Sequence, residues 1–137
     1  MERIESLIKD LTLEEKVSML SGSSAWHTTP VPRLGIPRIK MTDGPIGARG
    51  DSVSGETSAC FPSASCLSSS WDLDNIQEIA KAIGVEAKSK DADVLLGPTI
   101  NLHRHPLGGR HFECYSEDPI LTGELASSYV KGVQSVG

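Results

Sequence analysis

The chain has 137 residues, a length that fits one small domain or part of a larger one. Hydrophobic residues make up 38% and charged residues 23% of the sequence, as in ordinary globular proteins. The formal net charge is -5, and no basic stripe is present that could release counterions from phosphates. We therefore expect no nucleic-acid partner.

The sequence also argues against membrane association and disulfide bonding. No apolar run approaches the ~18 residues of a membrane span, and the charged N-terminal segment does not have the form of a signal peptide. Cys60, Cys66 and Cys114 show neither C-x-x-C spacing nor a disulfide framework. We interpret them as reduced thiols and expect a cytoplasmic protein.

Residues 1–20 are expected to form a helix interrupted by a cap. The first segment has one apolar face, made by Ile4, Leu7, Ile8 and Leu11. Thr12 and Glu15 form a capping-box pattern that begins a second segment, and Gly22 suits its end. Residues 21–37 contain several helix-breaking prolines and glycines and are expected to form a loop.

The middle of the chain alternates short strands and helices. Residues 38–42 are expected to form a strand, and Asp43-Gly44-Pro45 to end it. A loop rich in Gly and Ser follows at 44–59, and residues 61–69 are expected to hold a second strand. Asp72 is expected to cap a helix. Its apolar face is made by Ile76, Ile79, Ala80, Ile83 and Ala87.

A further strand is expected at residues 93–96, followed by a long polar loop at 97–119 and a helix that begins near Asp118 or Pro119. Strands alternating with helices are typical of α/β proteins with a parallel sheet. These units are too few to close a barrel, which takes about 200 residues or more. We predict an α/β fold that forms the incomplete N-terminal part of a (β/α)8 TIM-type barrel.

Two charged residues are candidates for ligand binding. Asp43 ends a strand, where its carboxylate can accept hydrogen bonds from ligand hydroxyls or can bond its own turn. Arg110 follows Gly108-Gly109, which lets a ligand come close, and its guanidinium offers planar donors. The alternative for Arg110 is a structural ion pair with Glu113 or Glu117.

Histidines and a tryptophan in loops are further candidates. His103 and His105 could belong to a metal site, but no further His or Cys follows at ligand spacing. The alternative is that these histidines and His111 bond carboxylates or backbone groups, and we predict no metal site. Trp26 can be a stacking platform for a sugar ring or a lid on the core.

Taken together, the segments resemble glycoside hydrolase family 3, of the β-glucosidase type. The matching motifs occur in family order and span almost the entire chain. They are Leu11-Thr12-Leu13-Glu14-Glu15-Lys16-Val17, Arg33-Leu34-Gly35-Ile36-Pro37, Thr42-Asp43-Gly44-Pro45 with Gly47 and Arg49-Gly50, Cys60-Phe61-Pro62, Gly97-Pro98 with Asn101, Pro106-Leu107-Gly108-Gly109-Arg110, Phe112-Glu113, and Ser116-Glu117-Asp118-Pro119.

The resemblance implies a retaining exo-β-glycosidase that hydrolyses terminal β-D-glucosyl residues of a small-molecule β-glucoside or an oligosaccharide, without a metal or organic cofactor. It implies that Asp43 and Arg110 bind hydroxyls of the terminal sugar and that Trp26 lies near it. His111 departs from the Asn or Gly that is commoner after that arginine. We expect this departure to alter the loop and to affect no catalytic role.

The resemblance also implies what residues 1–137 lack. In the family the nucleophilic Asp lies on a later strand, the acid/base carboxylate lies further along, and a Lys-His pair would follow shortly after Gly137. We therefore expect a partial barrel domain at 1–137, ending before the nucleophile, with no catalytic residue. Open alternatives are an inactive carbohydrate-binding remnant and a metal-dependent hydrolase using His103 and His105.

Overall fold

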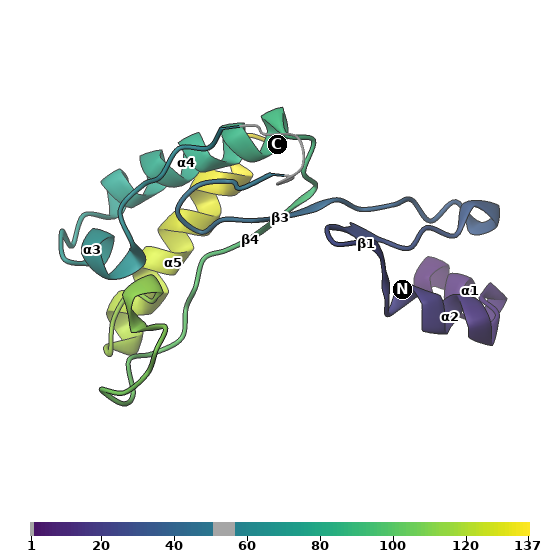
Figure 1. The fold of residues 1–137 in the computed structure, drawn as a ribbon, viewed down its shortest axis with the longest axis horizontal. Coiled ribbons are helices and arrows are strands. Elements are labelled where there is room, and N and C mark those ends of the chain that lie inside the picture. The colour runs from purple at the N-terminus through teal and green to yellow at the C-terminus, as the bar shows by residue number, and fades with distance from the viewer. Residues whose placement is uncertain (1, 51–56) are drawn as a thin grey trace. The chain divides into compact units, whose positions relative to one another are not determined.

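The computed structural model describes residues 2–50 and 57–137 (Figure 1). The helices are α1 (Glu2–Asp10), α2 (Leu13–Met19), α3 (Ala64–Ser68), α4 (Leu73–Ser89) and α5 (Pro119–Gln134), with 3-10 turns η1 (Pro32–Leu34) and η2 (His111–Glu113). The strands are β1 (Gly22–Ser24), β2 (His27–Thr28), β3 (Met41–Asp43) and β4 (Val94–Leu96). The chain divides into two compact units, Met1–Met41 and Thr42–Gly137.

The first unit begins with the expected interrupted helix. The capping box that starts α2 is confirmed, because Thr12 Oγ1 accepts from Glu15 N at 3.2 Å and Thr12 N donates to Glu15 Oε2 at 2.9 Å. Arg33 donates through Nε to Glu15 Oε1 at 2.7 Å and through Nη2 to Asp10 O at 2.8 Å. These contacts join the loop around η1 to both helices.

The predictions for residues 20–28 were wrong in two respects. Helix α2 ends at Met19, and Gly22 starts a strand instead of terminating the helix. Strands β1 and β2 then form an antiparallel hairpin where a loop was expected. Ser23 Oγ donates to Thr28 O at 2.9 Å across this hairpin. The hairpin is short and polar, so it lacks the apolar alternation that predicts strands.

The second unit has a hydrophobic core between α4 and α5, which lie side by side (Figure 1). Both helices and their caps are confirmed: Asp72 Oδ1 accepts from Asn75 N at 3.0 Å, and Asp118 Oδ1 accepts from Ile120 N at 2.8 Å. The side chains buried in this core include Ile76, Ala80, Ile83, Leu125 and Tyr129.

The strand predicted at 61–69 was wrong, because residues 64–68 form helix α3. Ala64 and Leu67 of this helix are buried in the core, and Ser68 Oγ donates to Tyr115 O at 2.6 Å. The segment is rich in serine and has no clear apolar period. Its conformation is therefore decided by packing against distant residues, which outweighs weak local propensity.

Strands β3 and β4 pair in a two-stranded sheet. Both expected strands are present, but β3 is shorter at its start than predicted: it begins at Met41 instead of residue 38 and extends to Asp43. Leu95 packs against the core, whereas Val94 and Leu96 on the other face of β4 are 41% and 45% exposed. In the described part of the chain no helix is long and apolar enough to cross a membrane.

Candidate active site

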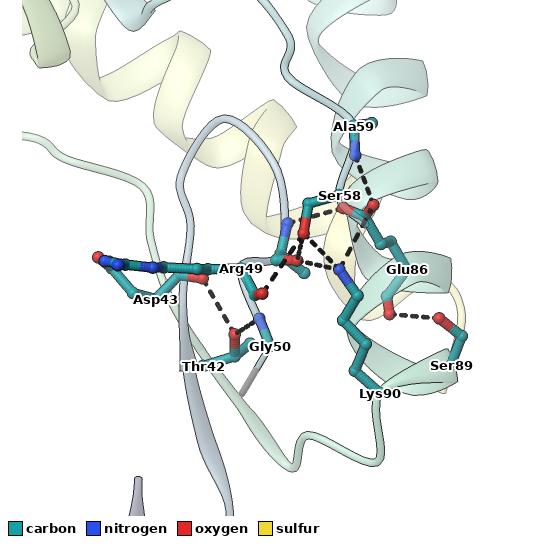
Figure 2. Close-up of polar contacts among 10 residues, drawn as sticks. Thr42, Asp43, Arg49, Gly50, Ser58, Ala59, Glu86, Ser89 and Lys90 are labelled. Atoms are coloured by element: carbon teal, nitrogen blue, oxygen red, sulfur yellow. Dashed lines mark hydrogen bonds and ion pairs between the residues drawn. The ribbon is translucent and has the colours of Figure 1, made fainter. Parts of the chain in front are cut away.

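Asp43 is the last residue of β3, and its backbone is held from two sides (Figure 2). Its carbonyl accepts from Arg49 N at 2.8 Å and from Thr42 Oγ1 at 3.0 Å. The Thr42 hydroxyl also accepts from Gly50 N at 2.8 Å. The Asp43 carboxylate is half-buried and makes no hydrogen bond to any residue that the structure describes, so both of its oxygens can accept from a ligand.

The turn after Asp43 requires glycine at two positions. Gly44 and Gly47 have φ angles of 137° and 152°, which side chains disfavour. A Cβ on Gly44 would lie 1.8 Å from Gly47 O, and one on Gly47 would lie 2.0 Å from Ala59 O. The two glycines of the segment Gly44-Pro45-Ile46-Gly47 are therefore required by the backbone conformation and by the close approach of other backbone atoms.

Arg110 lies in the loop after β4, just before η2, and its side chain is 81% exposed. Its Nε donates to Glu113 Oε1, so the structural pairing considered from the sequence is present, with Glu113 as the partner. This hydrogen bond, and then the charges of Glu113 and Asp43, raise the pKa of Arg110 further above its ordinary value. The guanidinium stays charged, and its terminal nitrogens make no hydrogen bond to described residues.

Asp43 and Arg110 line the same cavity, of about 450 Å³. Its other lining residues are Pro45, Leu96, Gly97, Pro98, Thr99 and Glu113. The loops after β3 and β4 meet here, because a Cβ on Gly97 would lie 3.1 Å from Pro45 Cα. A carboxylate acceptor and a guanidinium donor around a small cavity suit a ligand that carries several neutral hydroxyl groups.

A second cavity, of about 360 Å³, shares Asp43, Pro45 and Glu113 with the first and adds Arg49 and Phe112. The sequence analysis gave Arg49 no role of its own, although it lies six residues after Asp43 in the same motif. A charged residue that closes a Gly-rich turn beside a candidate carboxylate is the signal that could have singled it out.

Trp26 belongs to the first unit and lies in the turn between β1 and β2. The residue is half-buried, and its carbonyl accepts from Met41 N at 2.7 Å. The contact with a sugar ring stays a prediction.

The loop histidines make local contacts. His103 Nε2 donates to Cys114 O at 3.0 Å, and His105 Nδ1 accepts from Leu107 N at 3.2 Å. The His103 ring stacks on His111 with centroids 4.9 Å apart. His103 and His105 are therefore bonded to backbone groups, as the second of the two interpretations from the sequence expected. In the described ranges, 2–50 and 57–137, no three His, Cys, Asp or Glu residues gather as metal ligands would.

His111, the residue that departs from the family pattern, fits beside a glycine. A Cβ on Gly108 would lie 2.1 Å from His111 Nε2, so a side chain at 108 would require the imidazole to move. Gly108, and not Gly109, is thus the glycine that lies against the departing residue.

Comparison with known proteins decides the family. Residues 7–137 match the glycosyl hydrolase family 3 N terminal domain. The chain belongs to glycosyl hydrolase family 3. Beta-glucosidase B of Emericella nidulans is 52% identical over 136 residues, which are 98% of this chain and 16% of that protein. A beta-glucosidase of Rhizobium radiobacter is 54% identical over 136 residues, 98% of this chain and 17% of that protein.

Solved family 3 structures agree with the fold. The beta-glucosidase from Kluyveromyces marxianus in complex with glucose superposes with a TM-score of 0.86 at 46% identity, covering 96% of this chain and 16% of that chain. For beta-glucosidase 3B from Thermotoga neapolitana in complex with glucose the TM-score is 0.82 at 41% identity, covering 97% and 21%.

The predicted fold class is therefore confirmed: the chain is an α/β segment corresponding to the N-terminal part of a TIM-type barrel domain. Its described residues do not form a closed barrel. The chain spans about a sixth of the length of the family 3 relatives it matches first.

Proposed function

We propose that the whole protein to which this chain belongs is a retaining exo-β-glycosidase that removes terminal β-D-glucosyl residues. The observation that carries the proposal is that a carboxylate and a guanidinium, Asp43 and Arg110, line one cavity and belong to two of the motifs that carry the family resemblance. The relatives' names support it further, since those named above are beta-glucosidases and two solved ones hold glucose.

In this proposal the chain supplies one side of the pocket for the terminal sugar. Asp43 accepts hydrogen bonds from sugar hydroxyls, and Arg110 donates to others while Glu113 fixes its orientation. Trp26 is proposed as a further substrate-binding residue on the family resemblance alone. A hydrogen bond to a charged partner is worth about 1.5–3 kcal/mol when that partner is removed, so two such residues supply substantial discrimination for a sugar.

We assign no catalytic carboxylate to residues 1–137. Retaining glycosidases need two carboxyl groups about 5–5.5 Å apart, one attacking the anomeric carbon and one protonating the leaving oxygen. Asp43 is proposed as a binding residue, because it sits in the motif that the resemblance links to sugar hydroxyls. The chain is then part of a barrel domain whose nucleophile and acid/base lie elsewhere in the full-length protein.

The proposed chemistry requires no metal or organic cofactor. The substrate is a soluble β-glucoside or an oligosaccharide, with neither nucleic acid nor membrane as partner. We further propose a cytoplasmic location, which the three unpaired cysteines favour because reduced thiols persist in that compartment. Cell fractionation of the source organism with an antibody to the chain would test this.

The experiment is an assay of the full-length protein with an aryl β-glucoside, alongside the aryl α-glucoside and β-galactoside. Preferential release of aglycone from the β-glucoside, with β-glucose as the first product, is expected. Activity should survive exhaustive chelation, and its loss with recovery on adding zinc or manganese would favour the metal-dependent alternative. An inactive full-length protein that still binds glucose would favour the carbohydrate-binding remnant.

A further inference from the structure

Glu86 in the last turn of α4 and Lys90, the residue that follows the helix at its C-cap, both direct their side chains at the segment after β3 (Figure 2). They lie one helical turn apart, with Lys90 Nζ 3.7 Å from Glu86 Oε1. The Lys90 residue is only 5% exposed. Neither residue lines the cavity that contains Asp43 and Arg110.

Glu86 joins two backbone segments that are separate in sequence. Its Oε2 accepts from Ala48 N at 2.8 Å, and its Oε1 accepts from Ala59 N at 2.7 Å. The two oxygens of the Glu86 carboxylate therefore bond two different segments of the backbone. A Cβ on Gly47, the residue before Ala48, would lie 2.0 Å from Ala59 O, so the two segments that Glu86 joins approach each other closely at this glycine.

Lys90 completes the arrangement around the same alanine. Its Nζ donates to Ala48 O and to Ser58 Oγ, and the Ser58 hydroxyl in turn donates to Ala48 O at 2.7 Å. The amide of Ala48 is thus bonded to Glu86 and its carbonyl to Lys90, at the C-terminal end of α4. Backbone groups of a turn that lacks regular ladder partners are satisfied in this way.

The fixed alanine leads directly to the candidate site. The next residue, Arg49, donates its backbone N–H to Asp43 O at 2.8 Å, and Gly50 N donates to Thr42 Oγ1 at 2.8 Å. Arg49 also lines the cavity that it shares with Asp43. A displacement of Ala48 would therefore be transmitted to both charged residues within one or two peptide units.

Stability alone is a weak reason for such a pair. A nearly buried ammonium group loses its hydration, and apolar residues of similar volume often stabilise a fold as well as a buried ion pair does. The N–H groups of Ala48 and Ala59, in contrast, need acceptors at defined positions, and the carbonyl of Ala48 needs a donor. Glu86 supplies both acceptors and Lys90 supplies the donor.

We propose that Glu86 and Lys90 are a positioning pair that sets the location of Asp43 and Arg49 at the edge of the sugar pocket without contacting the sugar. The expected effect on kinetics rests on the proposed function. The expected effect on the backbone of the turn does not, so the positioning role and the proposed function can be refuted separately.

The test compares Glu86→Gln and Lys90→Met with matched variants on the exposed side of the same helix, Glu78→Gln and Lys81→Met. A glutamine at 86 keeps one acceptor but turns a donor toward the second alanine N–H. Amide hydrogen exchange of the full-length protein, without ligand, should quicken at least tenfold across residues 43–50 in the first two variants only. Unchanged exchange there would overturn the inference.

The kinetic arm uses a double-mutant cycle with Asp43→Ala. Glu86→Gln should lower kcat/KM for an aryl β-glucoside at least tenfold when Asp43 is present and less than twofold when it is absent. Equal losses in both backgrounds would mean that the pair acts on the fold generally, and the inference would be overturned.

A third variant, which removes less of the hydrogen-bonded arrangement, can be used if Glu86→Gln and Lys90→Met do not fold. Ser58→Ala removes one hydroxyl of the arrangement and should shift both readouts in the same direction by a smaller factor; no shift would overturn the inference. An inactive wild-type protein would refute the proposed function, and the exchange measurement would then decide whether the pair holds the turn.

Discussion

Asp43 and Arg110 line the same cavity, but the chain holds them by different means. Asp43 ends a strand, and its backbone is fixed by Thr42 and Arg49 and, through Ala48, by Glu86 and Lys90 at the end of α4. Arg110 lies in an irregular loop with its side chain largely exposed, and Glu113 is its hydrogen-bond partner.

Because Asp43 is held more firmly than Arg110, we expect the two residues to contribute differently to catalysis. Groups on strands are held more precisely than groups on loops, and precise placement matters most where an interaction strengthens in the transition state. We therefore expect Asp43 to affect the chemical step as well as binding. We expect Arg110 to act chiefly on binding, because its loop can adjust to the bound sugar. The predictions below apply to the full-length protein and test this comparison.

Asp43→Ala should give the largest loss, at least tenfold in kcat/KM with the fold intact. Removal of a charged hydrogen-bond partner costs about 1.5–3 kcal/mol, and each ~1.4 kcal/mol is tenfold in rate. Part of the loss should appear in kcat, because the contact tightens as the sugar ring distorts toward an oxocarbenium-like state. Steady-state kinetics with an aryl β-glucoside, with circular dichroism as a check on folding, decides this; a loss confined to KM would contradict it.

Arg110→Ala should lower kcat/KM by about tenfold, from the same loss of a charged partner, but mainly through a higher KM. Arg110→Lys should recover only part of the loss, since an ammonium group lacks the planar pair of donors. The measurement is the same kinetic series with both variants. A kcat effect as large as that of Asp43→Ala would show that the loop is as rigid as the strand end.

Glu113→Gln should have a smaller effect, about threefold on KM, because it weakens the side-chain hydrogen bond that Arg110 makes to Glu113. The effect should disappear in the Arg110→Ala background, where there is nothing left to orient. Kinetics of the two single variants and the double variant test this, and equal effects in both backgrounds would assign Glu113 a separate role.

His103→Ala should be nearly silent in catalysis, within about twofold in kcat/KM. His103 bonds Cys114 O and stacks on His111, so its loss should instead reduce stability by roughly 0.5–1.5 kcal/mol, the worth of one hydrogen bond. Denaturant unfolding monitored alongside activity separates the two effects. Abolished activity that metal ions restore would replace the glycosidase proposal with the metal-dependent alternative.

The predictions from sequence succeeded where the determinants are local. Helices α1, α2, α4 and α5 follow from apolar periodicity and from caps at Thr12, Asp72 and Asp118, all of which act within a few residues. Strands β3 and β4 were found for a similar reason, because each is a short run bounded by turn residues. The ordered set of motifs sufficed for the family.

The tertiary structure decided the features that depend on distant residues. Helix α3 forms because Ala64 and Leu67 bury against a core supplied mainly by α4 and α5, which its serine-rich sequence does not indicate. The hairpin β1–β2 depends on hydroxyl-to-carbonyl contacts that leave no periodic pattern. In both cases the competing local conformations differ little in free energy, so long-range contacts select between them.

The same division applies to the candidate site. The sequence by itself placed Asp43 at a strand end and Arg110 in a Gly-rich loop, because turn chemistry and residue type are local properties. Only the tertiary structure brought both into one cavity and set Glu86 against Ala48 N, 38 residues away. Contacts of that separation depend on how α4 packs beside the turn, and no residue spacing encodes that geometry.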